Sequence, residues 1–155
     1  MLPSPAGARV RLIPPAVYMG PFAMTWALHR WQPSTIPGGA VSGIGGLALL
    51  LSGIALTIWS AVMFRHAHTS VIPWEHVSAM VTTGPFGFSR NSIYLAAAIT
   101  YLGGSLLIHS WWPLVVLPGV GLVMQRKVVD REERYLTERF GEAYREYQLC
   151  VRRWL

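Results

Sequence analysis

Two groups of polar residues in this 155-residue chain have types and spacing suited to holding a small charged ligand. The first is Arg90, which follows the turn-rich stretch 84–89 and precedes a long apolar run. A guanidinium beside the start of a helix is a good binding site for a carboxylate. The second is the pair Glu132 and Glu133, whose carboxylates can hold an ammonium group. The alternatives are an arginine that only marks a membrane boundary and an ordinary charged helix start.

A third polar group contains histidines. His66 and His68 are followed by Glu75 and His76, and all four are of types that bind metals. Their spacing is specific to no known metal site, so we interpret them as interfacial residues of a polar loop and predict no metal. Cys150 is the single cysteine, which excludes an intramolecular disulfide and a cysteine-based zinc site. We interpret it as an unreactive interfacial residue.

Charged residues are few and unevenly distributed. Only 13% of the residues are charged and 52% are hydrophobic, whereas soluble domains carry about 25% charged residues. Stretches 32–64 and 91–125 contain no charge at all, while 126–153 is densely charged. The pattern predicts an integral membrane protein with a polar tail. The net charge of +6 does not indicate nucleic-acid binding, because the arginines lie at the ends of apolar segments, where lipid headgroups are their natural partners.

Four apolar segments predict an all-α membrane bundle of about four transmembrane helices, at about 12–28, 40–64, 93–108 and 111–124. The first is interrupted by prolines and follows two arginines like a signal peptide, but it lacks a clear cleavage site, so we expect a helix that stays. The short connection between the last two segments predicts a helical hairpin. It places Trp111 and Trp112 at the far membrane interface.

Glycines in the apolar segments favour close helix packing. They are Gly39, Gly43, Gly46 and Gly53 in the second segment and Gly103 and Gly104 in the third. A nucleotide-binding loop at 43–46 is a poor alternative, because no strand precedes it.

The tail, 127–149, is predicted to be one amphipathic helix on the cytoplasmic headgroups. Its apolar face is formed by Val129, Leu136, Phe140, Tyr144 and Tyr147, and Gly141 is a weak point within it.

The arginines also predict the topology. Arg9, Arg11, Arg65, Arg90 and the basic tail all fall on one side of the membrane if the chain crosses four times. The positive-inside rule then places both termini and the 65–92 loop in the cytoplasm. The hairpin brings the start of the third span beside the end of the fourth. Arg90 therefore faces the glutamate pair, an arrangement that suits a zwitterionic amino-acid group.

Five short segments together resemble the isoprenylcysteine carboxyl methyltransferase and phospholipid methyltransferase superfamily. They are 64–73, 81–86, 89–94, 132–136 and 140–144. The resemblance covers roughly 40–155, and we treat 1–155 as a single domain in which 1–39 forms a variable first span.

The resemblance implies S-adenosylmethionine-dependent methyl transfer to a lipophilic acceptor, a carboxylate, thiol or amine, at the cytoplasmic face. It implies a cofactor site formed by Arg90, Asn91, Tyr94, Glu132 and Glu133, with Tyr94 near the sulfonium. Asn91 and Ser92 stand where the family usually has His and Pro. An amine acceptor would need a general base that the sequence does not identify.

Two other functions fit the same residues. A nicotinamide-dependent membrane reductase is one, since some sterol reductases have a similar C-terminal half. A non-catalytic membrane scaffold descended from the family is the other, because Asn91 and Ser92 depart from the usual motif.

Overall fold

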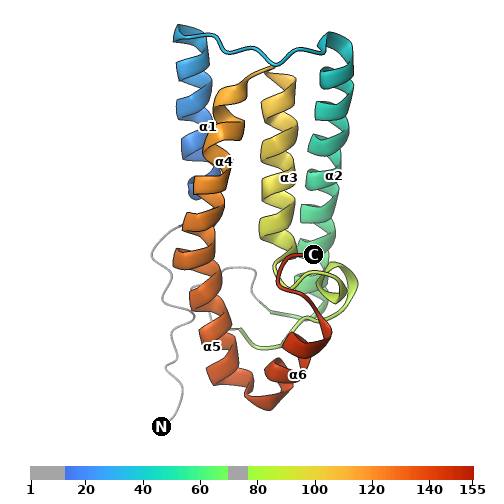
Figure 1. Cartoon of the computed structure of the whole chain (residues 1–155). Coiled ribbons are helices and arrows are strands. Elements are labelled where there is room, and N and C mark those ends of the chain that lie inside the picture. Colours follow the sequence, from blue (N-terminus) through green and yellow to red (C-terminus); the bar gives the residue numbers. More distant parts are fainter. Residues whose placement is uncertain (1–12, 70–76) are drawn as a thin grey trace.

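The computed structural model describes residues 13–69 and 77–155, and the described chain is helical (Figure 1). Four long helices run alongside one another: α1 (Pro14–Trp31), α2 (Gly39–His66), α3 (Ser92–Leu107) and α4 (Trp111–Met124). The expectations for Arg9, Arg11, Glu75 and His76 fall outside the described residues.

The predicted hairpin of α3 and α4 is confirmed, and α4 has the predicted bounds. Its turn lies at the end of the bundle away from the charged tail, beside the α1–α2 connection (Figure 1). The Ile36 backbone N–H donates to the His109 carbonyl at 2.9 Å, and the indole N–H of Trp112 donates to the Gln32 carbonyl at 2.9 Å. Ser110 caps α4 by accepting a hydrogen bond from the Trp112 N–H. The tryptophan turn between α3 and α4 is therefore hydrogen-bonded to the α1–α2 connection.

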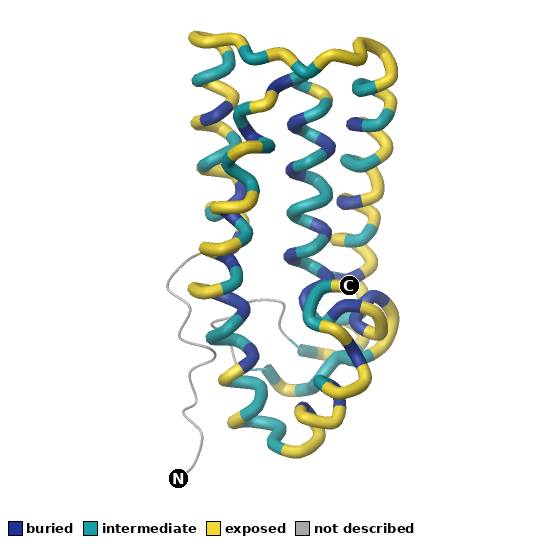
Figure 2. Tube along the Cα trace, viewed as in Figure 1, coloured by how far each residue is buried: buried dark blue, intermediate teal, exposed yellow. Residues whose placement is uncertain are grey.

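In the described part of the chain, two helices are long and apolar enough to cross a membrane, α2 and the continuous helix Trp111–Phe140. At about 1.5 Å per residue the 28 residues of α2 span about 42 Å, more than the ~30 Å hydrocarbon core of a bilayer. Only 11% of its most apolar window is buried, unlike the core helix of a soluble protein. Many residues along α2 are exposed (Figure 2), and several of them are large and hydrophobic. The predicted number of four crossings and the cytoplasmic placement of the termini stay predictions.

Glycine explains how closely α2 and α3 pack. A Cβ added to Gly46 would lie 2.9 Å from the Gly103 carbonyl oxygen, and one on Gly53 would lie 2.8 Å from the Ala96 carbonyl oxygen. On Gly103 it would meet the Leu50 backbone nitrogen. The packing prediction holds at these positions. It is wrong for Gly39 and Gly43, where an added Cβ would meet nothing within 4 Å.

The tail differs from the prediction of one helix. A turn of π-helix, η2 (Gln125–Val129), continues α4 into α5 (Asp130–Phe140). Gly141 then adopts a φ of 57° and ends α5, and α6 (Glu142–Cys150) turns back (Figure 1). Much of the expected headgroup-facing surface is instead buried in the protein, because Val129 joins the main core and Tyr144 and Tyr147 join a second core with Val151.

Candidate ligand-binding site

The short 3₁₀ turn η1 (Gly84–Gly87) and the residues that follow it lead into the start of α3. The Ser92 hydroxyl lies 2.7 Å from the carbonyl oxygens of both Pro85 and Ser89 and ties the turn to the helix. Asn91 is the N-cap residue of α3, but its side chain does not bond to the backbone of that helix. The Asn91 amide instead donates to the carbonyl oxygen of Arg153 at 3.0 Å, so it joins α3 to the C-terminal segment.

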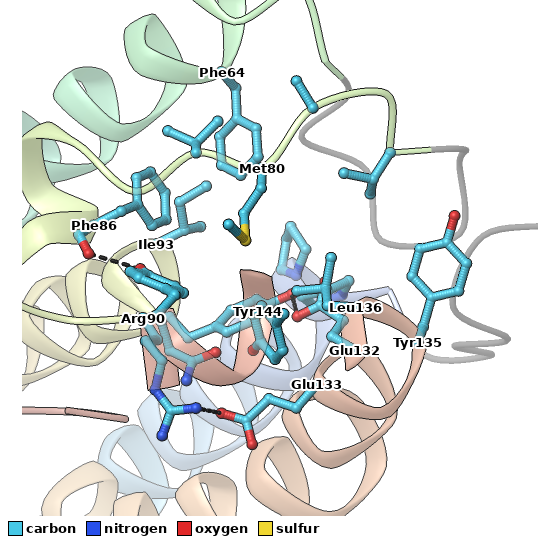
Figure 3. Close-up of a pocket in the computed structure, with 18 of the residues that line it drawn as sticks. Phe64, Met80, Phe86, Arg90, Ile93, Glu132, Glu133, Tyr135, Leu136 and Tyr144 are labelled. Carbon is cyan, nitrogen blue, oxygen red and sulfur yellow. Dashed lines mark hydrogen bonds and ion pairs between the residues drawn. The ribbon is translucent and has the colours of Figure 1, made fainter. Parts of the chain in front are cut away.

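Arg90 and Glu133 meet as the predicted hairpin requires. Nη1 of Arg90 lies 3.1 Å from Oε1 of Glu133, and the two side chains are only 12% and 8% exposed (Figure 3). Within the described part of the chain, Nε of Arg90 is buried and has no hydrogen-bond partner. A buried N–H without a partner costs about 1–3 kcal/mol, so this edge of Arg90 is well suited to donate a hydrogen bond to a ligand oxygen.

A second polar pair joins α3 to α5. The Tyr94 hydroxyl donates to Oε2 of Glu132 at 2.8 Å, and the Tyr18 hydroxyl donates to the Tyr94 carbonyl at 3.1 Å. Among the described residues no cation lies within ion-pair distance of Glu132, whereas Glu133 also pairs with Arg153. The two neighbouring glutamates are thus in different electrostatic environments.

All five residues expected at the site line one cavity of about 360 Å³. It lies at the end of the bundle that carries α5 and α6, between the end of α2, the start of α3 and these two helices. Most of the remaining wall is apolar. Its labelled apolar members in Figure 3 are Phe64, Met80, Phe86, Ile93 and Leu136.

Helix α6 closes the cavity with two tyrosines. The Tyr147 hydroxyl donates to the Phe86 carbonyl oxygen at 2.6 Å, which fixes α6 on the turn η1. Burial raises the pKa of Tyr144 to about 12, so its hydroxyl stays protonated at neutral pH and can donate a hydrogen bond.

Sequence reasoning missed Arg153. Its side chain donates to both oxygens of Glu133 and, at 3.4 Å, to Oδ1 of Asp130. The hydrogen bond to Glu133 raises the pKa of Arg153 above its usual value. The available signal was the pair Arg152 and Arg153 just beyond the tail helix, facing an acidic group about twenty positions earlier in the chain.

The histidines do not contribute to the cavity wall in the described residues. His66 is the last residue of α2, and His68 lies in the following turn with a φ of 49°. Across 13–69 and 77–155 no three metal-binding side chains gather.

Over the described residues, the protein is helical, with two candidate membrane-spanning helices and, at one end, a cavity with charged residues in its wall. Residues 41–143 match the model of the phospholipid methyltransferase family. The chain belongs to this family, within the isoprenylcysteine carboxyl methyltransferase and phospholipid methyltransferase superfamily, and the resemblance seen in the sequence is confirmed. Membership implies membrane methyltransferase activity.

A similar protein occurs in Haemophilus influenzae and has no characterised function. It is 38% identical over 63 residues, which cover 41% of this chain and 90% of the relative. No solved structure matches the chain.

Proposed function

We propose that this protein transfers a methyl group from S-adenosylmethionine to a lipophilic or membrane-associated acceptor at the cytoplasmic membrane face. One observation carries the proposal. A single cavity gathers an arginine with a buried unpartnered N–H and a glutamate without a cationic partner among the described residues. These groups complement the carboxylate and the ammonium of the cofactor's amino-acid moiety.

The residues present fit that cofactor. Arg90 would bind its carboxylate, and Glu132 would bind its ammonium group or ribose. We prefer Glu132 to Glu133 for this role, because Glu133 is already held by Arg90 and Arg153. The Asn91 side-chain amide donates to the Arg153 carbonyl oxygen, and its own carbonyl oxygen can still accept a hydrogen bond. Asn91 also lines the cavity.

Catalysis by these residues would rest on positioning. S-adenosylmethionine, when bound, supplies an electrophilic methyl group on a sulfonium. The Tyr94 ring and the Glu132 carboxylate both line the cavity and favour a neighbouring cation. Holding the two reactants in line is the main contribution a protein can make to such a displacement. A carboxylate or thiolate acceptor needs no general base.

The apolar wall supports a lipophilic acceptor. The cavity volume of about 360 Å³ lies at the lower end of the roughly 300–1,000 Å³ of small-molecule sites. It suits one cofactor-sized ligand, and an acceptor would then approach from outside this volume. Phe64, at the end of the exposed apolar helix α2, contributes to the wall, so a hydrophobic molecule in the bilayer would have an apolar approach to the site.

Thermal unfolding of the purified protein in detergent tests the proposal. We expect S-adenosylhomocysteine to raise the melting temperature and NADPH to leave it unchanged. Incubation with S-adenosylmethionine carrying a labelled methyl group should then label a lipid-extractable product. Stabilisation by NADPH alone would favour a reductase. No stabilisation by either nucleotide and no labelled product would favour the scaffold.

A further inference from the structure

The segment 151–155 lies beside the candidate site and connects the start of α3 to α5. The Arg90 backbone N–H donates to the Arg152 carbonyl at 3.1 Å, and the Asn91 amide donates to the Arg153 carbonyl at 3.0 Å. Val151 packs into the second core beside Tyr144 and Tyr147. The backbone of this segment therefore lies against the start of α3, while the side chain of Arg153 reaches α5.

The side chain of Arg153 is fixed by a network on the solvent side of the site. It donates to Oε1 of Glu133 at 3.2 Å, to Oε2 of the same carboxylate, and to Oδ1 of Asp130 at 3.4 Å. Asp130 in turn accepts a hydrogen bond from Gln125 at 2.7 Å, and Gln125 accepts one from the Trp154 indole at 3.0 Å. Arg153 is thus anchored through α5 and through its own neighbour.

Glu133 separates two spaces. It lines the cavity together with Arg90, and it lines an open polar groove together with Arg153 on the other side. The exposed fractions of the two side chains fit this placement: Arg153, at the open groove, is 41% exposed, and Arg90, at the cavity, is 12% exposed. The carboxylate is therefore held between an inner and an outer guanidinium.

Two arginines share the Glu133 carboxylate, and this sharing determines which N–H groups of Arg90 are left for a ligand. An arginine alone with a carboxylate forms a bidentate pair that occupies two of its N–H groups. Here Oε2 of Glu133 is taken by Arg153, and Arg90 is left with one close contact to Oε1 and a buried Nε without a hydrogen-bond partner in the described chain.

We propose that Arg153 is a positioning residue for ligand binding: it holds the Glu133 carboxylate from the solvent side, so that Glu133 does not close on Arg90 and Arg90 keeps N–H groups for a ligand carboxylate. The proposal rests on the proposed function, because it takes that carboxylate to belong to the cofactor's amino-acid moiety. Without Arg153, Glu133 would form a bidentate pair with Arg90, and the ligand would have to break that pair before binding.

Calorimetric binding to the full-length chain in detergent tests this role. The probes are S-adenosylhomocysteine, which carries the amino-acid carboxylate, and 5′-methylthioadenosine, which lacks it. We expect Arg153→Ala to bind S-adenosylhomocysteine about tenfold more weakly, the equivalent of one lost favourable contact, and to bind methylthioadenosine as the wild type does. Arg153→Lys should recover part of the loss. Arg145→Ala is the matched control, since Arg145 also pairs with a glutamate on the tail but is 63% exposed.

The double variant Arg153→Ala with Glu133→Gln separates positioning from a merely structural role. A neutral glutamine has no charge to close on Arg90, so S-adenosylhomocysteine binding should return toward the wild-type value. If Arg153 only supported the fold, removing a second ion-pair partner would weaken binding further and would lower the melting temperature. That result, or unchanged binding by Arg153→Ala, would overturn the inference and leave the proposed function standing. Failure of the wild type to bind S-adenosylhomocysteine would overturn both.

Discussion

At the scale of single residues, the two neighbouring glutamates of the cavity have different partners. Glu133 is held by Arg90 and Arg153, whereas Glu132 accepts a hydrogen bond from Tyr94. Arg90 and the two glutamates could be selected because they are charged residues at the ends of apolar segments, and Tyr94 was selected through the family resemblance. Charge alone could not distinguish Glu132 from Glu133. That distinction comes from Arg153, whose contacts depend on the path of the chain after Gly141. The Asn91 side chain binds the Arg153 carbonyl oxygen of the same segment instead of capping α3.

The tyrosines near the cavity give a residue-scale prediction. Tyr147→Phe should lower the free energy of unfolding by about 1–3 kcal/mol, because the buried Phe86 carbonyl loses its donor. Tyr135→Phe is the matched control: the Tyr135 hydroxyl is buried and has no hydrogen-bond partner among the described residues, so its removal should cost nothing. Denaturant unfolding in detergent measures both. Equal losses in the two variants would contradict the hydrogen-bond assignment.

At the scale of elements, the bounds of α4 followed from local signals, since Ser110 is a good N-cap and the apolar run ends at Met124. The tail was mispredicted because its apolar periodicity continues past Gly141, and periodicity does not show whether such a face meets lipid or protein. Tyr147, for example, is held by a hydrogen bond to Phe86 of η1, which lies 61 positions earlier in the chain.

Glycine packing gives the element-scale prediction. Gly103→Ala should destabilise the protein by about 1–3 kcal/mol, because the added methyl group would meet the Leu50 backbone of α2, which cannot move aside as a side chain can. Gly43→Ala should be neutral or stabilising by up to about 1 kcal/mol, since its surroundings are open and alanine is the better helix former. Thermal unfolding in the same detergent compares them. A wild-type melting temperature for Gly103→Ala would show that the two helices are not so closely packed.

At the scale of the whole molecule, the segregation of charge predicted an all-α membrane protein, and the structure has two helices suited to crossing a bilayer. The ends of the bundle also differ as expected: the α1–α2 loop and the tryptophan turn lie at one end, and the charged tail at the other (Figure 1). We propose four crossings with both termini in the cytoplasm.

Cysteine labelling tests that topology. Cys150 is exposed and serves as a natural label for the tail. Gln32→Cys, in a Cys150→Ser background, labels the opposite loop, where the side chain is exposed. In intact cells a membrane-impermeant maleimide should modify the cysteine at 32 and leave Cys150 unmodified until the membrane is opened. Modification of both from the same side would contradict the four-crossing topology.

The central claim is that Arg90 and Glu132 bind the charged ends of one cofactor, and calorimetric binding of S-adenosylhomocysteine tests it most directly. Arg90→Ala and Glu132→Ala should each weaken binding by about 1.5–3 kcal/mol, the usual worth of a hydrogen bond to a charged group, or roughly 10- to 150-fold in Kd. Glu142→Ala is the control, because Glu142 is 74% exposed and pairs only with Arg145 among the described residues. The account predicts weak binding by the first two variants and normal binding by the control. Equal affinities in all three folded variants would contradict it.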